Sequence, residues 1–122
     1  MPGKYKVSPA NERRALGRTF DSKAEMMYAL NLQLMVEQEL IRDYICQPKL
    51  WLGVPEYTYT PDFLVIPFTP ENKEGGSPYY VDVCGVMTPS KKRHMKMWKE
   101  HGRLQLLLVK HKGNGKFEEI DW

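Results

Sequence analysis

Two aspartates lie in stretches of strand-forming sequence where an acidic side chain is unfavourable. Asp62 directly precedes the apolar run 63–66, and Asp82 lies inside the run 79–83. Because aspartate is depleted in strands, each needs a particular reason to be there. Divalent metal binding is one reason, since Mg²⁺ is held by one or two carboxylates together with waters and phosphate oxygens. The alternatives are a turn at the strand start for Asp62 and a plain structural role for Asp82.

Glu25 is a third candidate acid, in the first turn of an expected helix. Residues 22–25 read Ser-Lys-Ala-Glu and fit the S-x-x-E capping box. A capping role alone would explain Glu25, but it does not exclude metal binding. Gln47 is either a polar site residue or an ordinary loop residue. The cysteines and histidines show no zinc-ligand spacing, and two cysteines make no disulfide framework.

The elements that must position these acids are expected in the order α-β-β-β-α-β, an α/β fold with a mixed sheet. The first helix begins near Ser22 and should end before Ile45, because Pro48 favours extended geometry just before it. Its expected apolar stripe is Met27, Leu30 and Leu34, widened by Met26 and Met35. Strands are expected at 49–52, 57–66, 79–85 and 104–109.

A second helix is expected between the last two of these strands. Thr88 is the N-cap, Pro89 takes the first helical position, and Gly102 ends the helix after His101. Met95 and Trp98 should pack this helix on the sheet. Pro67–Pro78 reads as a loop, and 111–122 as a turn with a short strand. Residues 1–19 are expected to form a basic flexible arm, and 20–122 a single domain.

Charge is unevenly distributed along the 122-residue chain, although the net charge is only +3. Residues 86–112 carry eight basic residues and one acid, and residues 1–23 carry six basic residues and two acids. Such clustering is typical of a surface that binds a polyanion, while solvated helix faces are the alternative. No apolar run approaches the ~20 residues of a membrane helix, and the first residues lack the apolar region of a secretory signal.

The motif order resembles the PD-(D/E)XK nuclease signature. Pro61-Asp62 is followed twenty residues later by Asp82-Val83-Cys84, and Glu25 stands upstream on a helix, as in many members. The similarity spans residues 18–110 and is to small phage endonucleases and to Holliday-junction resolvases of the archaeal type. The resemblance implies a restriction-endonuclease-like mixed sheet flanked by helices.

The resemblance also implies metal-dependent phosphodiester hydrolysis. Asp62 and Asp82 would bind Mg²⁺, or Mn²⁺, directly, with the main-chain carbonyl of Val83 as a further ligand. Glu25 would act through water or a second ion. The metal would activate water and stabilise the departing 3′ oxygen. The residues expected to bind DNA are Lys91, Lys92, Arg93, Lys96 and Lys99 in the second helix, and Arg13, Arg14 and Arg18 in the arm.

Cys84 departs from the signature, because the family's catalytic lysine would stand at this position. A thiol supplies no positive charge to a phosphate. Three explanations stay open. The substitution was introduced to trap substrate, or the chain is a natural binding-only relative, or Lys91 or Lys92 reaches into the site instead. We expect the chain to bind a junction tightly and cut it poorly, and Cys84→Lys to restore cutting with little change in affinity. Failure of Cys84→Lys to cut any DNA would favour the binding-only relative.

Three functions therefore compete. The first is an Mg²⁺-dependent, structure-selective endonuclease of the Holliday-junction resolvase type, and the second a DNA-binding module with a catalytically dead nuclease fold. The third is a protein-interaction domain whose basic surface is incidental. For the first we expect four-way junction or branched duplex DNA as partner and a homodimer, since resolvases make two matched cuts. Trp51, Met26 and Met35 are the candidate dimer contacts. For the endonuclease we expect a cytoplasmic protein, which could be encoded by a phage of a bacterial host.

Overall fold

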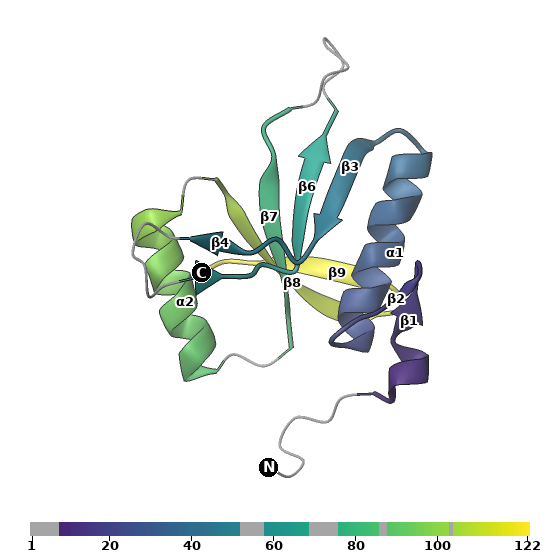
Figure 1. Cartoon of the computed structure of the whole chain (residues 1–122), viewed down its shortest axis with the longest axis horizontal. Coiled ribbons are helices and arrows are strands. Elements are labelled where there is room, and N and C mark those ends of the chain that lie inside the picture. Colours follow the sequence, from purple (N-terminus) through teal and green to yellow (C-terminus); the bar gives the residue numbers. More distant parts are fainter. Residues whose placement is uncertain (1–7, 52–57, 69–75, 86–87, 103) are drawn as a thin grey trace.

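The computed structural model describes residues 8–51, 58–68, 76–85, 88–102 and 104–122 as a mixed α/β fold (Figure 1). The main sheet has the order β3-β6-β7-β8-β9, with β7 and β8 parallel and the other neighbours antiparallel. Its strands are β3 Ile41–Cys46, β6 Phe63–Pro67, β7 Tyr79–Cys84, β8 Leu106–Gly113 and β9 Lys116–Ile120. The helices are α1 Lys23–Glu37 and α2 Pro89–His101, and they lie on opposite sides of this sheet. The expected mixed sheet flanked by helices is confirmed.

Local hydrogen bonds define both ends of α1. Ser22 caps the helix as expected, with its hydroxyl accepting a hydrogen bond from the Glu25 N–H at 3.0 Å. At the other end, Leu40 N–H donates to the Met35 carbonyl and Glu39 N–H to the Val36 carbonyl, which is a Schellman ending. The left-handed residue of this turn is Glu39, with φ 59°, where glycine is usual.

The helix ends at Glu37, before Ile45 as expected. The chain turns after Glu37 and enters β3, the first strand of the main sheet. The expected strand 49–52 instead contributes β4 (Leu50–Trp51), which pairs with β5 (Thr58–Tyr59) in a separate two-stranded sheet. Residues 52 and 57 of the expected strands, and 69–75 of the expected loop, lie outside the described residues. The main sheet and its helices follow the chain order α1, β3, β6, β7, α2, β8 and β9, and β3 is a strand that was not expected.

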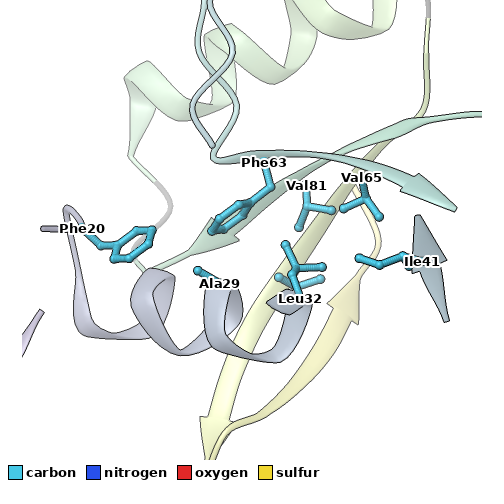
Figure 2. Packing of buried hydrophobic residues seen from close by; sticks show 8 residues of the cluster. Phe20, Ala29, Leu32, Ile41, Phe63, Val65 and Val81 are labelled. Atoms are coloured by element: carbon cyan, nitrogen blue, oxygen red, sulfur yellow. The ribbon is translucent and has the colours of Figure 1, made fainter. Parts of the chain in front are cut away.

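The buried side of α1 also differs from the expected stripe. Ala29 and Leu32 are fully buried, whereas Leu30 and Leu34 are 41% and 52% exposed. Apolar residues occur on nearly every side of this helix, so spacing alone could not select the correct row. The main sheet completes this core with Ile41, Phe63, Val65, Val81 and Val109, and Phe20 joins it from the segment just before α1 (Figure 2).

The opposite face of the sheet packs against α2. Thr88 caps this helix by accepting from the Lys91 N–H, and Pro89 begins it, as expected. Met95 and Trp98 are 4% and 5% exposed and pack against Leu108 and Leu106 of β8. The indole N–H of Trp98 donates to the Leu104 carbonyl at 3.1 Å. These contacts fix how far α2 is rotated about its own axis, and therefore which basic side chains face β7.

The stretch expected to be an arm contains local structure among residues 8–19. A 3₁₀ helix at Ala10–Glu12 leads into a hairpin of β1 (Arg14–Ala15) and β2 (Arg18–Thr19). Arg13 donates to the carbonyls of Ser8 and Phe20 at 2.7 and 2.6 Å. Residues 1–7 lie outside the described residues. The described part of the arm is thus tied to the start of the domain by a guanidinium group. No helix among the described residues is long and apolar enough to cross a membrane.

The close approach of Gly102 to Trp98 gives a test of how α2 is anchored. A Cβ at position 102 would lie 2.5 Å from the Trp98 ring, so the ring would have to move. We expect Gly102→Ala to lower the free energy of unfolding by about 1–3 kcal/mol, the usual effect of overpacking. Gly85→Ala is the control, since nothing lies within 4 Å of its added carbon. Equal urea denaturation midpoints for the two variants would contradict this packing.

Candidate functional site

The register of β6 against β7 places the two strand-borne aspartates opposite each other. Phe63 pairs with Val81 and Leu64 with Tyr80 in an antiparallel ladder. Continuing that register by one residue places Asp62 opposite Asp82. Directly opposed side chains of an antiparallel pair have Cβ atoms only ~4.5–5.5 Å apart, and like charges there are destabilising. The arrangement expected from the sequence, in which both aspartates belong to one site, is thus a consequence of strand pairing.

Each aspartate accepts a hydrogen bond from the other strand. Asp62 N–H donates to Asp82 Oδ1 at 2.9 Å, and Val83 N–H donates to Asp62 Oδ2 at 2.7 Å. These reciprocal bonds hold both carboxylates in fixed positions at the start of β6. Asp82 is only 2% exposed, while Asp62 is half-buried.

Glu25 reaches the same place from the first turn of α1. It is 3% exposed, and its carboxyl group lies near that of Asp62, whose negative charge raises the Glu25 pKa. Gln47 follows β3 in the chain and lies beside Glu25. Its side-chain amide donates to Glu25 Oε1 at 3.3 Å and to Asp21 Oδ2 at 3.1 Å, while its N–H donates to the Asp62 carbonyl at 2.8 Å. Gln47 is therefore a polar residue of the site, and its φ of 52° helps turn the chain there.

Lys91 enters the site from the first turn of α2. Its Nζ lies 3.2 Å from Asp82 Oδ2, and its side chain is 23% exposed. Oδ2 is buried and accepts no hydrogen bond of good geometry, so the contact is an ion pair only. Lys92, the next residue, is exposed. His94, one turn further along α2, is close enough to influence the charge state of Asp82.

Burial raises the pKa of all three carboxyl groups. The pKa of Asp62 is raised by burial, although the Val83 N–H and Lys91 act against this. The pKa of Asp82 is likewise raised by burial, and Lys91 opposes the rise. Burial and the neighbouring charge of Asp62 raise the pKa of Glu25 to about 8. Three acids near one another thus compete for too little positive charge, and one of them holds a proton at neutral pH.

A divalent cation fits part of this donor set. Among the described residues, no group of three or more His, Cys, Asp or Glu side chains is arranged to hold a metal ion. Mg²⁺ needs fewer protein ligands, because it is usually bound by one or two carboxylates and keeps several waters. Asp62 and Asp82 supply two fixed carboxylates, and Asp82 Oδ2 is a buried oxygen without a hydrogen bond. The aspartate pair fits Mg²⁺ or Mn²⁺, whereas Glu25 in its protonated form does not ligate directly.

Cys84 lies on the same face of β7 as Asp82, two residues further along the strand. It is 8% exposed and packs with Met95 and Leu108 under α2. Both cysteines are free thiols. Position 84 therefore belongs to the packing between β7 and α2, and its thiol contributes no charge to the aspartate pair.

Most of the expected DNA-binding residues are exposed. Lys92, Arg93, Lys96 and Lys99 lie on the outer side of α2, away from Met95 and Trp98. In the hairpin, Arg14 and Arg18 are exposed, with Arg18 over the Phe20 ring at 5.5 Å. Arg13 differs, since its guanidinium already bonds two carbonyls. We assign Arg13 to the fold and keep the others as candidate phosphate contacts.

No known family model matches the chain. No curated protein is significantly similar to it in sequence. The relation to nucleases therefore stays a proposal, supported by the residues and geometry above.

Sequence reasoning found the three acids but missed part of their surroundings. His94 carried no recognisable spacing, and its place near Asp82 depends on how α2 packs. Gln47 was left undecided because its side chain acts across 22 residues of sequence, on Glu25. Lys91 and Lys92 were indistinguishable in the sequence, and only the rotation of α2 separates them.

The raised pKa of Glu25 predicts a pH-dependent stability in the absence of metal. Glu25 goes from an ordinary value of 4.5 to about 8 on folding, so the folded state retains a proton that the unfolded state loses. The free energy of unfolding should fall as the pH rises above about 4.5 and level off above about 8. Glu25→Gln should make this fall shallower in urea denaturation with EDTA. Exposed Glu37→Gln is the control, and equal slopes for both variants would contradict the assignment.

Proposed function

We propose that this protein is a Mg²⁺-dependent DNA endonuclease of the PD-(D/E)XK type. The observation that carries the proposal is the pairing of Asp62 with Asp82 across β6 and β7, fixed by reciprocal main-chain hydrogen bonds. Like charges are placed opposite each other in a buried position, which is unfavourable without positive charge nearby, and the single Lys91 ammonium group can offset only one of the two carboxylates. The parallel strands β7 and β8 are neighbours in the sheet and are connected through α2. This order of helices and strands agrees with the fold that the signature implies.

The proposed roles follow from the contacts of each side chain. Asp62 and Asp82 would hold the metal ion, which would activate a water molecule and stabilise the leaving 3′ oxygen. The Val83 N–H orients Asp62, and the Val83 carbonyl is a candidate ligand through the resemblance alone. Glu25 would hold a proton or a metal-bound water, and Gln47 positions it. DNA would lie against the exposed basic side of α2.

The proposed substrate is a four-way junction or branched duplex, acted on inside the cell. The basic residues of α2 at 92, 96 and 99 follow one helical row, which suits contacts to successive phosphates. Phosphate contacts supply affinity without reading sequence, as a structure-selective enzyme requires. The alternative is a DNA-binding module with a dead nuclease fold, because Cys84 replaces the lysine of the signature. Metal-dependent cleavage of DNA distinguishes the endonuclease from the binding module.

Cleavage should require both aspartates. With Mg²⁺ or Mn²⁺, we expect the chain to cut a four-way junction faster than a linear duplex of the same sequence. Asp62→Asn and Asp82→Asn should each slow cutting by at least ~10²-fold, the usual effect of losing one group that stabilises transition-state charge. Exposed Asp121→Asn is the control and should cut at the normal rate. Metal-dependent cutting that survives Asp82→Asn would refute the site, and no cutting of any DNA would favour the binding module.

The homodimer remains part of the proposal, with different contacts. Met26 and Met35, expected as dimer contacts, pack partly against the core, and the Trp51 side chain lies outside the described set. Leu30, Leu34 and Leu40 are instead 41–59% exposed. Leu30 and Leu34 form one row on α1, and an exposed apolar row of this kind is typical of a protein interface. A second copy of the chain would bury it and supply the second active site for a matched pair of cuts.

A charge placed in this row should break the dimer. We expect Leu34→Glu to shift the sedimenting species at micromolar concentration from dimer to monomer while DNA binding in EDTA persists. Exposed Gln105→Glu adds the same charge elsewhere and should leave the dimer intact. A wild-type chain that stays monomeric with and without junction DNA would remove the resolvase assignment and leave a nuclease possible.

A further inference from the structure

At position 84, where the nuclease signature has a lysine, the side chain is part of the packing between β7 and α2. Cys84 faces α2 and is enclosed by Met95 and Leu108, with 8% of its surface exposed. The side chain that carries positive charge to the aspartate pair comes from the next element of the chain, seven residues later. Lys91 is the third residue of α2, and its ammonium group lies 3.2 Å from Asp82 Oδ2.

Lys91 occupies this position against local electrostatic preference. The first turn of a helix favours negative charge, because the unpaired N–H groups there carry partial positive charge. A lysine in that turn is therefore stabilised by something outside the helix, here the buried carboxylate of Asp82. Its backbone is held by the Thr88 cap, which accepts from the Lys91 N–H at 3.0 Å. Lys92, the next residue, is exposed to solvent, so the two lysines are not equivalent.

We propose that Lys91 is the catalytic lysine of this site and that Cys84 does not impair the enzyme. This inference rests on the proposed nuclease function. In the free protein Lys91 neutralises Asp82. With DNA and metal bound, Asp82 would help to hold the metal ion, and the flexible four-carbon stem of Lys91 would let its ammonium group turn to a non-bridging oxygen of the scissile phosphate. There it stabilises the negative charge that develops in the transition state.

Besides the DNA, the aspartate pair with its metal ion and Lys91, the chemical step needs only water. A water oxygen forms a bond to phosphorus and the bond from phosphorus to the 3′ oxygen breaks. The attacking water gives up one proton to solvent, and the leaving 3′ oxygen takes one up. Lys91 takes no part in these proton transfers. It supplies charge and position, and no proton is transferred from it.

Single-turnover cleavage of a four-way junction at saturating DNA tests the role of Lys91. Lys91→Met keeps the stem and removes the charge, so we expect the rate to fall ~10²–10³-fold. Lys91→Arg keeps the charge and should retain more activity than Lys91→Met. Adding Cys84→Lys to Lys91→Met should restore part of the rate, because the charge returns to the same face of β7. Exposed Lys116→Met is the matched control and should cut normally.

Two readouts that do not depend on cutting separate a catalytic from a structural role. Affinity for junction DNA in EDTA should change little in Lys91→Met, with a salt slope altered by at most ~0.9. Lys92→Met should instead act on this affinity. Mn²⁺ binding measured by calorimetry should persist or tighten in Lys91→Met, because a competing positive charge has been removed. Loss of Mn²⁺ binding would show that Lys91 only holds Asp82 in place, and would overturn the proposal.

The remaining outcomes distinguish the two levels of inference. If the wild type cuts and Lys91→Met cuts equally fast, the assignment of Lys91 is wrong while the nuclease function stands. If the wild type does not cut but Cys84→Lys does, the site is a nuclease site and Lys91 does not replace the missing lysine. If neither the wild type nor Cys84→Lys cuts any DNA with Mg²⁺ or Mn²⁺, the proposed function itself fails, and Lys91 with it.

Discussion

Two carboxylates held opposite each other across an antiparallel strand pair are the constraint on which this structure depends. Asp62 and Asp82 each accept a main-chain N–H from the facing strand, so neither can turn away from the other without leaving a buried donor unpaired. Burial raises the pKa of both carboxyl groups, because the charged form loses contact with water. The protein meets their mutual repulsion with the Lys91 ammonium group and with a proton on Glu25.

The surrounding elements can be understood as supports for that pair. The Schellman turn after α1 directs β3 alongside β6, and the end of β3 delivers Gln47 to Glu25. On the other face, Trp98 packs against Tyr80 and Tyr59 with ring centroids 5.2 and 5.7 Å away. That packing sets the rotation of α2. One face of the sheet thus supplies Glu25 and its partner, and the other supplies Lys91.

Local sequence signals predicted those features that short segments determine by themselves. The Thr88-Pro89 start of α2, its end at Gly102 and the Ser22 cap all follow from hydrogen bonding and backbone geometry within a few residues. The strand β3 at Ile41–Cys46 was not expected, because the turn before it has Glu39 in a left-handed conformation that usually marks glycine. The choice between Lys91 and Lys92, and the exposure of Leu34, depend on packing between distant segments. No spacing within one helix contains that information.

The central claim is that Asp62 and Asp82 together bind a divalent cation, and anomalous diffraction from crystals grown with Mn²⁺ tests it most directly. We expect one strong peak between the two strands, bonded to a carboxylate oxygen of each aspartate at about 2.1 Å, the length typical of Mg²⁺–oxygen bonds. Lys91 Nζ should then have left Asp82 Oδ2. A crystal that shows Mn²⁺ only elsewhere, with the Lys91–Asp82 ion pair intact, would show that the aspartate pair does not bind the ion.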